Sequence, residues 1–362
     1  MRPALLPETI ERTVYAGDVG SAPVFIVGAP RSSTTLLRNM LNRHSAMAIC
    51  RETGFYHYVY LRRRSFGDLA SARKRERLID AFLSSERVRR TRMNLKLLRS
   101  HLLSEGCNYR DFYSSFLLFN AHAHEKQRWG EKTPHPLFIE TLCDWYPRAR
   151  VLHLLRDPRD VVRSLLGVPW APDGVLANAR WWLRDNLNAF RSHSRPRYLQ
   201  VRYEDLATRP EQELRRICAF LHEEYEPAML MPRHDPTADR PWFQRAEQPV
   251  TVERVEKWRG ELRPEDVGLI EWVVGPHLQA FGYQPVAPPP SRVLRLRAAA
   301  AEALDAVRQH AGEFSGWLVL PAAFDQTGCG GSRQRQVSIP RLTGDHWFLM
   351  KSIVLVHDSC DS

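Results

Sequence analysis

The residues best suited to binding an anion stand near the start of the chain, directly after a short apolar run. Residues 23–27 predict a buried strand, and Gly28 and Pro30 favour a tight turn after it. A helix that begins after such a turn directs backbone N–H groups and the positive end of its dipole at an anion. The same segment carries one guanidinium and four hydroxyls, which belong to Arg31, Ser32, Ser33, Thr34 and Thr35. The segment therefore predicts a phosphate or sulfate site.

This loop lacks the features that hold a nucleoside triphosphate with its metal ion. A Walker A loop reads G-x-x-x-x-G-K-[ST], and its lysine reaches the β- and γ-phosphates. Counted from Gly28, Ser33 stands at the second glycine position and Thr34 stands at the lysine position. The alternative is that the hydroxyls cap a helix and that the loop binds no ligand.

A second cationic cluster follows another apolar run. Residues 150–155 predict a strand buried on both faces, and Arg156 stands at its carboxyl end. Asp157 suits the N-cap of the next helix, and Pro158 suits its first position. Ser164 lies two turns into that helix. An arginine fork can bind phosphate oxygens here, and the alternative is a surface helix with ordinary charges.

The two clusters resemble the donor-binding motifs of the sulfotransferases that use 3′-phosphoadenosine 5′-phosphosulfate (PAPS). The 5′-phosphosulfate loop of that family typically reads PRSGTT, and this chain departs from it at Ser33, where the family has glycine. A side chain there adds strain if the residue needs a positive φ. The family's 3′-phosphate signature is an Arg followed eight residues later by a Ser, which matches Arg156 and Ser164. The resemblance implies that Arg31 to Thr35 hold the 5′-phosphosulfate.

Two later segments resemble further elements of that family. Residues 198–206 predict a third strand and contain Tyr203, which matches the tyrosine of a YEDL element that lies near the adenine. A role as a core aromatic is the alternative for this tyrosine. The segment around Lys257 and Arg259 resembles the element that closes over the nucleotide. Between them, Thr208-x-x-Glu211 predicts a capping box for a helix through residue 221.

Sulfuryl transfer needs a base for the acceptor hydroxyl and a cation for the charge that develops on the oxygens. Glu52 follows the first helix and resembles the catalytic base of the tyrosylprotein and heparan-sulfate sulfotransferases. The alternative is a surface carboxylate paired with Arg51. Some relatives use histidine as the base, so four further candidates stay open, His57, His122, His124 and His135.

Lys132 is the candidate for the second role. Thr133 and Pro134 predict the start of a helix that runs to about residue 146, so Lys132 stands just before a helix. It resembles the lysine that neutralises the transferring sulfuryl group in the same relatives, and a solvated surface lysine is the alternative. The six cysteines are scattered and no metal-ligand motif is present, so we expect no metal site and a metal-independent reaction.

Bulk properties are those of a soluble globular protein of ordinary composition. The chain has 362 residues and a net charge of +11, which attracts an anionic donor. It shows no apolar run long enough to span a membrane, no signal-peptide pattern and no nucleic-acid-binding module. We therefore expect a cytoplasmic protein with no membrane span and no specific nucleic-acid partner.

The sequence predicts a three-layer α/β fold of the P-loop type, with a mostly parallel central sheet, helices on both faces and the donor at the carboxyl ends of the strands. We predict an arm over 1–22 and a sulfotransferase domain over 23–285 that contains a basic helical insertion at about 61–128. Residues 286–362 read as a Pro-rich linker, an Ala-rich helix and a tail of unknown role.

The predicted activity is transfer of a sulfuryl group from PAPS to a small-molecule, glycan or peptide hydroxyl. The acceptor is left open because the residues that select it lie in the variable insertion. Two other functions stay open, a small-molecule kinase of the P-loop type and a noncatalytic protein that binds nucleotides or polyanions.

Overall fold

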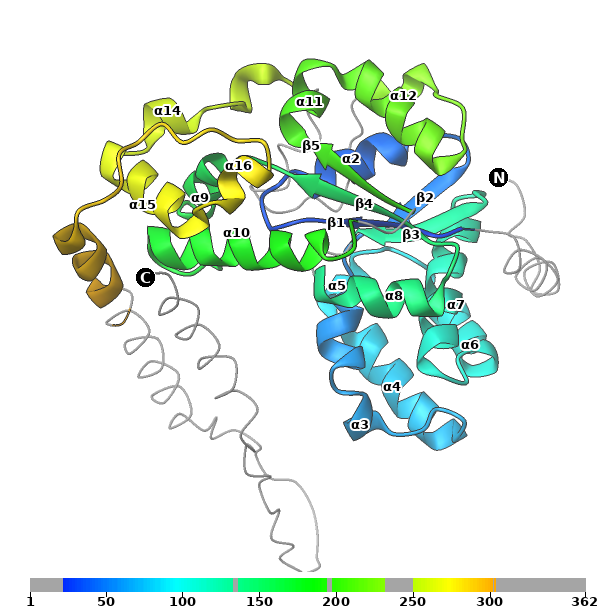
Figure 1. The fold of residues 1–362 in the computed structure, drawn as a ribbon. Helices are drawn as coiled ribbons and strands as arrows, with labels where there is room; N and C mark the ends of the chain where they lie inside the picture. Colours follow the sequence, from blue (N-terminus) through cyan, green and yellow to red (C-terminus); the bar gives the residue numbers. More distant parts are fainter. Residues whose placement is uncertain (1–21, 133–135, 194–196, 232–249, 302, 304–362) are drawn as a thin grey trace, which may run out of the picture. The chain divides into compact units, whose positions relative to one another are not determined.

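The central feature of the fold is one parallel sheet with the strand order β2-β3-β1-β4-β5 (Figure 1). The computed structural model describes residues 22–132, 136–193, 197–231, 250–301 and 303. Every neighbouring pair of strands in the sheet is parallel. The strands are β1 (Val24–Val27), β2 (Met47–Cys50), β3 (Arg128–Lys132), β4 (Arg150–Leu155) and β5 (Tyr198–Arg202). The predicted α/β class with a parallel sheet is confirmed.

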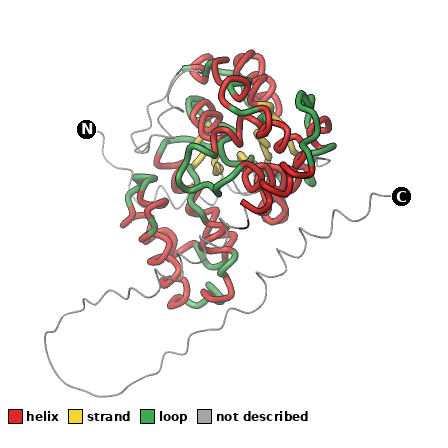
Figure 2. The backbone as a smooth tube through the Cα atoms, turned by 90° about the vertical axis from the view of Figure 1, so that its left-hand side faces the viewer, coloured by secondary structure: helices red, strands yellow, loops and turns green. Residues whose placement is uncertain are grey.

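Helices follow the strands and lie around the sheet (Figure 2). Those outside the 61–128 range are α2 (Thr34–Leu41), α8 (Ile139–Trp145), α9 (Pro158–Leu165), α10 (Val175–Phe190), α11 (Tyr203–Thr208), α12 (Pro210–Leu221), α14 (Trp258–Glu261), α15 (Pro264–Val274) and α16 (His277–Ala280). Short 3-10 turns occur at η2 (Pro136–Phe138), η3 (Pro227–Leu230) and η5 (Val252–Arg254). Among the described residues, no helix is long and apolar enough to cross a membrane.

Successive residues of the central strand β1 pack into different cores, because side chains of a strand alternate between the two faces of a sheet. Val24 and Ile26 belong to a core that includes Leu37 of α2 and Ile217 of α12. Phe25 points to the other face and joins an aromatic core. A further core lies between α9, α10 and α15. The fold therefore has three layers, as predicted.

The 61–128 range contains α3 (Arg63–Phe66), α4 (Ala72–Ser84), α5 (Glu86–Arg89), α6 (Leu95–Glu105) and α7 (Tyr109–Ala123). A π-helical turn, η1 (Tyr56–Tyr60), precedes them. Aromatic rings connect these helices to the sheet. Phe55 stacks on Tyr113 of α7, with their ring centres 4.5 Å apart. Tyr113 in turn stacks on Phe25 of β1, with ring centres 6.4 Å apart. The helices thus share a core with the strand that precedes the predicted anion loop.

The strand register brings the predicted site residues to one edge of the sheet. Ile26 pairs with Lys132, and Leu155 pairs with Arg202. Because all five strands are parallel, their carboxyl ends lie at the same edge, where ligands of such sheets bind. Gly130 permits the close pairing of β3 with β1, since a Cβ there would lie 1.8 Å from the carbonyl oxygen of Val24.

Several local predictions were wrong. The strand predicted for 198–206 ends at Arg202, and the YEDL segment forms helix α11. The capping box is absent, because Arg209 is the N-cap of α12 and the Thr208 hydroxyl donates to the Glu204 carbonyl at 2.8 Å. Strands β2 and β3 were not predicted at all. Both are only four or five residues long, and β3 carries polar and charged side chains.

Some predictions fall wholly or partly outside the described residues. The arm over 1–22 lies outside them apart from its last residue, and so do Thr133, Pro134 and His135. The next described elements after β3 are η2 and α8, which ends at Trp145. Of the C-terminal segment, residues 292–301 are helical, and residues 304–362 lie outside the described part.

Candidate active site

The loop between β1 and α2 is held tightly against the neighbouring strand. A Cβ on Gly28 would lie 2.5 Å from the Leu154 carbonyl oxygen, so only glycine fits there. Ser32 is completely buried, and its hydroxyl has no hydrogen-bond partner among the described residues. An unpaired buried hydroxyl costs free energy unless a ligand supplies the partner. At the start of α2, which Thr34 and Thr35 begin, an anion fits this requirement.

Ser33 has a left-handed backbone conformation, and the PRSGTT motif of the sulfotransferases has glycine at this position. Its φ is +69° and its ψ is 25°, in the left-handed region, and its side chain makes no capping hydrogen bond to α2. A side chain in this region is strained, and glycine adopts it readily. The strain expected from the departure at Ser33 is therefore present in the structure.

We expect Ser33→Gly to raise the free energy of unfolding by about 1 kcal/mol, because it removes this strain and no capping bond is lost. Urea denaturation of the two proteins measures the difference. Ser33→Ala is the control, since alanine keeps the Cβ and should leave the stability near that of the parent. A glycine variant less stable than the parent would contradict the strain.

The second cationic cluster lies beside this loop. Asp157 caps α9 by accepting a hydrogen bond from the Arg159 amide at 2.8 Å, and Pro158 is the first helical residue, as predicted. The Nε of Arg31 donates to the Ser164 hydroxyl at 2.9 Å. An Nη of Arg156 donates to the Arg31 carbonyl at 3.2 Å. The structure therefore brings together the residues predicted to bind opposite ends of one nucleotide.

Arg156 is buried and packs on Tyr203. Its guanidinium carbon lies 4.4 Å from the centre of the Tyr203 ring, a cation–π distance, and Tyr203 is itself 2% exposed. The Arg156 Nε has no hydrogen-bond partner among the described residues. A buried guanidinium nitrogen without a partner fits an anionic ligand better than a closed structural contact.

Glu52 and Lys132 form the second pair of interest. The Lys132 Nζ lies 3.5 Å from a Glu52 carboxylate oxygen, and the guanidinium of Arg87 bonds the other oxygen. Lys132 ends β3 and is buried, and this burial lowers its pKa, while the nearby Glu52 carboxylate opposes the change. The Glu52 side chain remains 24% exposed. The Glu52 carboxylate is therefore accessible to solvent and lies beside the buried Lys132 amine.

A buried carboxylate fixes the backbone next to Glu52. One oxygen of Glu131 accepts hydrogen bonds from the Thr53 amide at 2.6 Å and the Thr53 hydroxyl at 2.7 Å. The Tyr113 hydroxyl of α7 bonds the other oxygen. Burial raises the pKa of Glu131 to about 7, and these hydrogen bonds oppose the rise. Glu131 therefore connects the strand that carries Lys132 to the loop that carries Glu52.

The remaining candidates lie in different surroundings. Lys257 forms an ion pair with Glu261 at 3.1 Å, and Arg259 pairs with Glu256 at 2.8 Å. Both cations are at least 44% exposed. Each of these two cations therefore already has a carboxylate partner in its own segment.

Of the four histidines kept open as bases, His57 lies in η1, where burial lowers its pKa and the charge of Glu52 opposes this. His122 lies in the last turn of α7 and His124 caps its end. His135 is outside the described residues. Among the described side chains, no group of His, Cys, Asp and Glu could hold a metal ion.

Sequence reasoning missed Arg87, Thr53 and Glu131. Glu131 directly precedes Lys132, so its position in the strand was a usable signal once a strand was assigned there. Arg87 stands in a basic stretch with many other arginines, and nothing in the sequence distinguishes it from them.

A parallel sheet of this order, with a tight loop between its central strand and a helix, defines an α/β protein of the P-loop type. Residues 23–227 match the sulfotransferase family, and the chain belongs to that family. The predicted family resemblance is confirmed.

Individual relatives are similar over most of the chain. The protein-tyrosine sulfotransferase of Drosophila melanogaster is 26% identical over 296 residues, which cover 76% of this chain and 54% of the fly protein. The chain thus spans about half the length of that relative. Protein-tyrosine sulfotransferase 1 of Danio rerio is 27% identical, with 74% of each chain covered. The solved sulfotransferase domain from the curacin biosynthetic pathway aligns with a TM-score of 0.49 at 20% identity, covering 74% of this chain and 99% of that domain.

Proposed function

We propose that this protein transfers a sulfuryl group from PAPS to an acceptor hydroxyl. The observation that carries the proposal is the contact of Arg31 with Ser164 and of Arg156 with the Arg31 carbonyl at the carboxyl edge of the sheet. These contacts join two anion-binding groups into one region, which suits a nucleotide with a charged group at each end. Membership of the sulfotransferase family supports the same donor.

In this proposal the loop residues Arg31 to Thr35 hold the 5′-phosphosulfate, with the unpaired Ser32 hydroxyl as one donor. Arg156 and Ser164 hold the 3′-phosphate. Tyr203 lies against the Arg156 guanidinium and is the candidate for contact with the adenine. Lys257 and Arg259 remain weaker candidates, because glutamates already pair with both.

The proposed reaction forms a bond between the acceptor oxygen and sulfur and breaks the bond between sulfur and the 5′-phosphate oxygen. The acceptor proton passes to the Glu52 carboxylate, which is accessible and lies beside Lys132. The Lys132 ammonium offsets charge on the sulfuryl and leaving oxygens. The products are a sulfate ester and adenosine 3′,5′-bisphosphate.

We extend the proposal to a tyrosyl hydroxyl of a peptide or protein as the first acceptor to test. The relatives named as protein-tyrosine sulfotransferases support this choice. Small-molecule and glycan hydroxyls are the other acceptor classes. Incubation with sulfur-labelled PAPS and one representative of each class, including a tyrosine-containing peptide, identifies the class that takes up the label.

Calorimetry tests the donor directly and needs no acceptor. We expect adenosine 3′,5′-bisphosphate to bind, without metal, at least about tenfold more tightly than ADP, because only the former carries the 3′-phosphate. Repeating the titrations with ATP and Mg²⁺ provides the comparison for a kinase. Tighter binding of ADP or of ATP with Mg²⁺ would overturn the proposal in favour of the kinase.

A further inference from the structure

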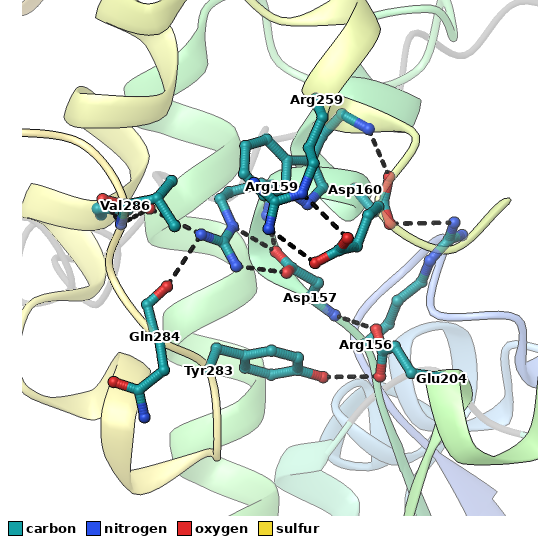
Figure 3. A network of polar contacts seen from close by, with 12 residues as sticks. Arg156, Asp157, Arg159, Asp160, Glu204, Arg259, Tyr283, Gln284 and Val286 are labelled. Carbon is teal, nitrogen blue, oxygen red and sulfur yellow. Dashed lines mark hydrogen bonds and ion pairs between the residues drawn. The ribbon is translucent and has the colours of Figure 1, made fainter.

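Arg159 is a buried residue that contacts four separate parts of the chain. Its Nε and one Nη donate to the two Asp157 oxygens, at 2.9 and 2.6 Å, and its other Nη donates to the Gln284 carbonyl at 3.1 Å (Figure 3). The same Nη also donates to Glu271 at 2.8 Å. The Trp258 ring lies 4.1 Å from its guanidinium carbon. All three nitrogens of the guanidinium therefore donate to protein groups, and these bonds use four of its five N–H donors.

These contacts attach the C-terminal segment over 250–287 to the start of α9. Glu271 of α15 accepts hydrogen bonds from the amides of Val286 and Ala287 at 2.9–3.1 Å. A second connection runs through Glu204, which accepts from the Asp157 amide at 2.9 Å and from the Tyr283 hydroxyl at 3.0 Å (Figure 3). Asp157, the N-cap residue of α9, is thus connected to this segment in two ways, through Arg159 and through Glu204.

The same segment orients Arg156, the proposed 3′-phosphate residue. An Nη of Arg156 donates to the Arg254 carbonyl at 2.8 Å. The Trp258 amide donates to one oxygen of Asp160 at 3.0 Å, and the other oxygen lies 3.9 Å from the Arg156 guanidinium. Arg254, whose carbonyl accepts from Arg156, therefore belongs to the segment that Arg159 attaches. Trp258, whose amide bonds the carboxylate beside Arg156, belongs to the same segment.

We propose that Arg159 is a positioning residue for recognition of the 3′-phosphate. It acts through Asp157 and the C-terminal segment to set the direction of the Arg156 guanidinium. The inference rests on the proposed function, since it requires that Arg156 bind the 3′-phosphate. It predicts that weakening the contacts of Arg159 lowers the contribution of the 3′-phosphate to nucleotide affinity. The affinity contributed by the rest of the nucleotide should not change.

The test compares two ligands that differ only in the 3′-phosphate, adenosine 3′,5′-bisphosphate and AMP. For Arg159→Lys we expect the dissociation constant of the bisphosphate to rise about tenfold and that of AMP to change less than about twofold, since lysine keeps the charge and loses the fork. The matched control is Arg216→Lys in α12. Arg216 likewise donates to both oxygens of a carboxylate, Glu213, and to a carbonyl, that of Gln200.

Glu271→Gln provides a second variant that weakens the same attachment if Arg159→Lys does not fold. We expect a loss in the same direction, about threefold for the bisphosphate alone. Equal losses for both ligands, or unchanged affinity for the bisphosphate, would overturn the positioning role. If the parent protein and Arg216→Lys show no preference for the bisphosphate over AMP, the proposed function itself is wrong and this inference with it.

Discussion

Glu52→Gln is expected to lower the rate of sulfuryl transfer by about 10²- to 10⁴-fold, because an amide of the same shape cannot accept the acceptor proton. The contact of Glu52 with Lys132 at 3.5 Å places this carboxylate beside the cation proposed to offset the developing charge. Transfer from sulfur-labelled PAPS to a tyrosine-containing peptide measures the rate. Binding of adenosine 3′,5′-bisphosphate should stay within about twofold, since Glu52 has no proposed role in holding the donor.

A matched control for this variant is Glu86→Gln. Glu86 also pairs with an arginine, Arg90, but it is exposed and lies on α5. We expect its substitution to leave the transfer rate unchanged. A Glu52→Gln protein that transfers at the parental rate would show that another group is the base. His57 would then be the first candidate to substitute, since it lies in η1 within the influence of the Glu52 charge.

Glu131→Gln is expected to stabilise the protein above pH 7, by up to about 3 kcal/mol. Burial raises the pKa of Glu131 to about 7, against an ordinary value of 4.5. Between these two values the folded protein holds a proton that the unfolded chain has released. The contribution of Glu131 to stability is therefore greatest below pH 4.5, falls as the pH rises to about 7, and stays low above it.

Glutamine is neutral at every pH, and its oxygen can still accept the two bonds from Thr53 while its amide donates to the Tyr113 hydroxyl. The difference in unfolding free energy between variant and parent should thus grow from near zero at pH 4.5 to its full size at pH 7. Urea denaturation at intervals across this range measures it. Glu86→Gln again provides the control. A difference that stays constant with pH would contradict the raised pKa of Glu131.

The predictable parts of this fold are those whose signals lie within a few neighbouring residues. β4 was predicted over its observed range, because residues 151–155 form a largely apolar run between Arg150 and Arg156. The start of α9 was predicted from Asp157 and Pro158, whose capping roles depend only on local backbone geometry. Even the strain at Ser33 followed from comparing one residue with the glycine of the resembling motif.

Elements whose residues depend on distant partners were missed or misjudged. β3 carries Glu131 and Lys132, and charged residues do not indicate a strand unless the partners that compensate them are known. Those partners, Thr53 and Glu52, come from the loop after β2, about 80 residues earlier. The strand that begins at Tyr198 was predicted to continue through the YEDL segment, because nothing local marks Arg202 as the last strand residue.

By itself, the sequence determined the loop after the first strand, the start of α9, and the family resemblance that both motifs carry. Only the tertiary structure decided that Arg31 reaches Ser164, that Glu52 meets Lys132 and that Arg159 attaches the C-terminal segment. The physical reason is the parallel order of the strands. It gathers the ends of distant segments at one edge of the sheet, and local sequence patterns do not encode which segments become neighbours.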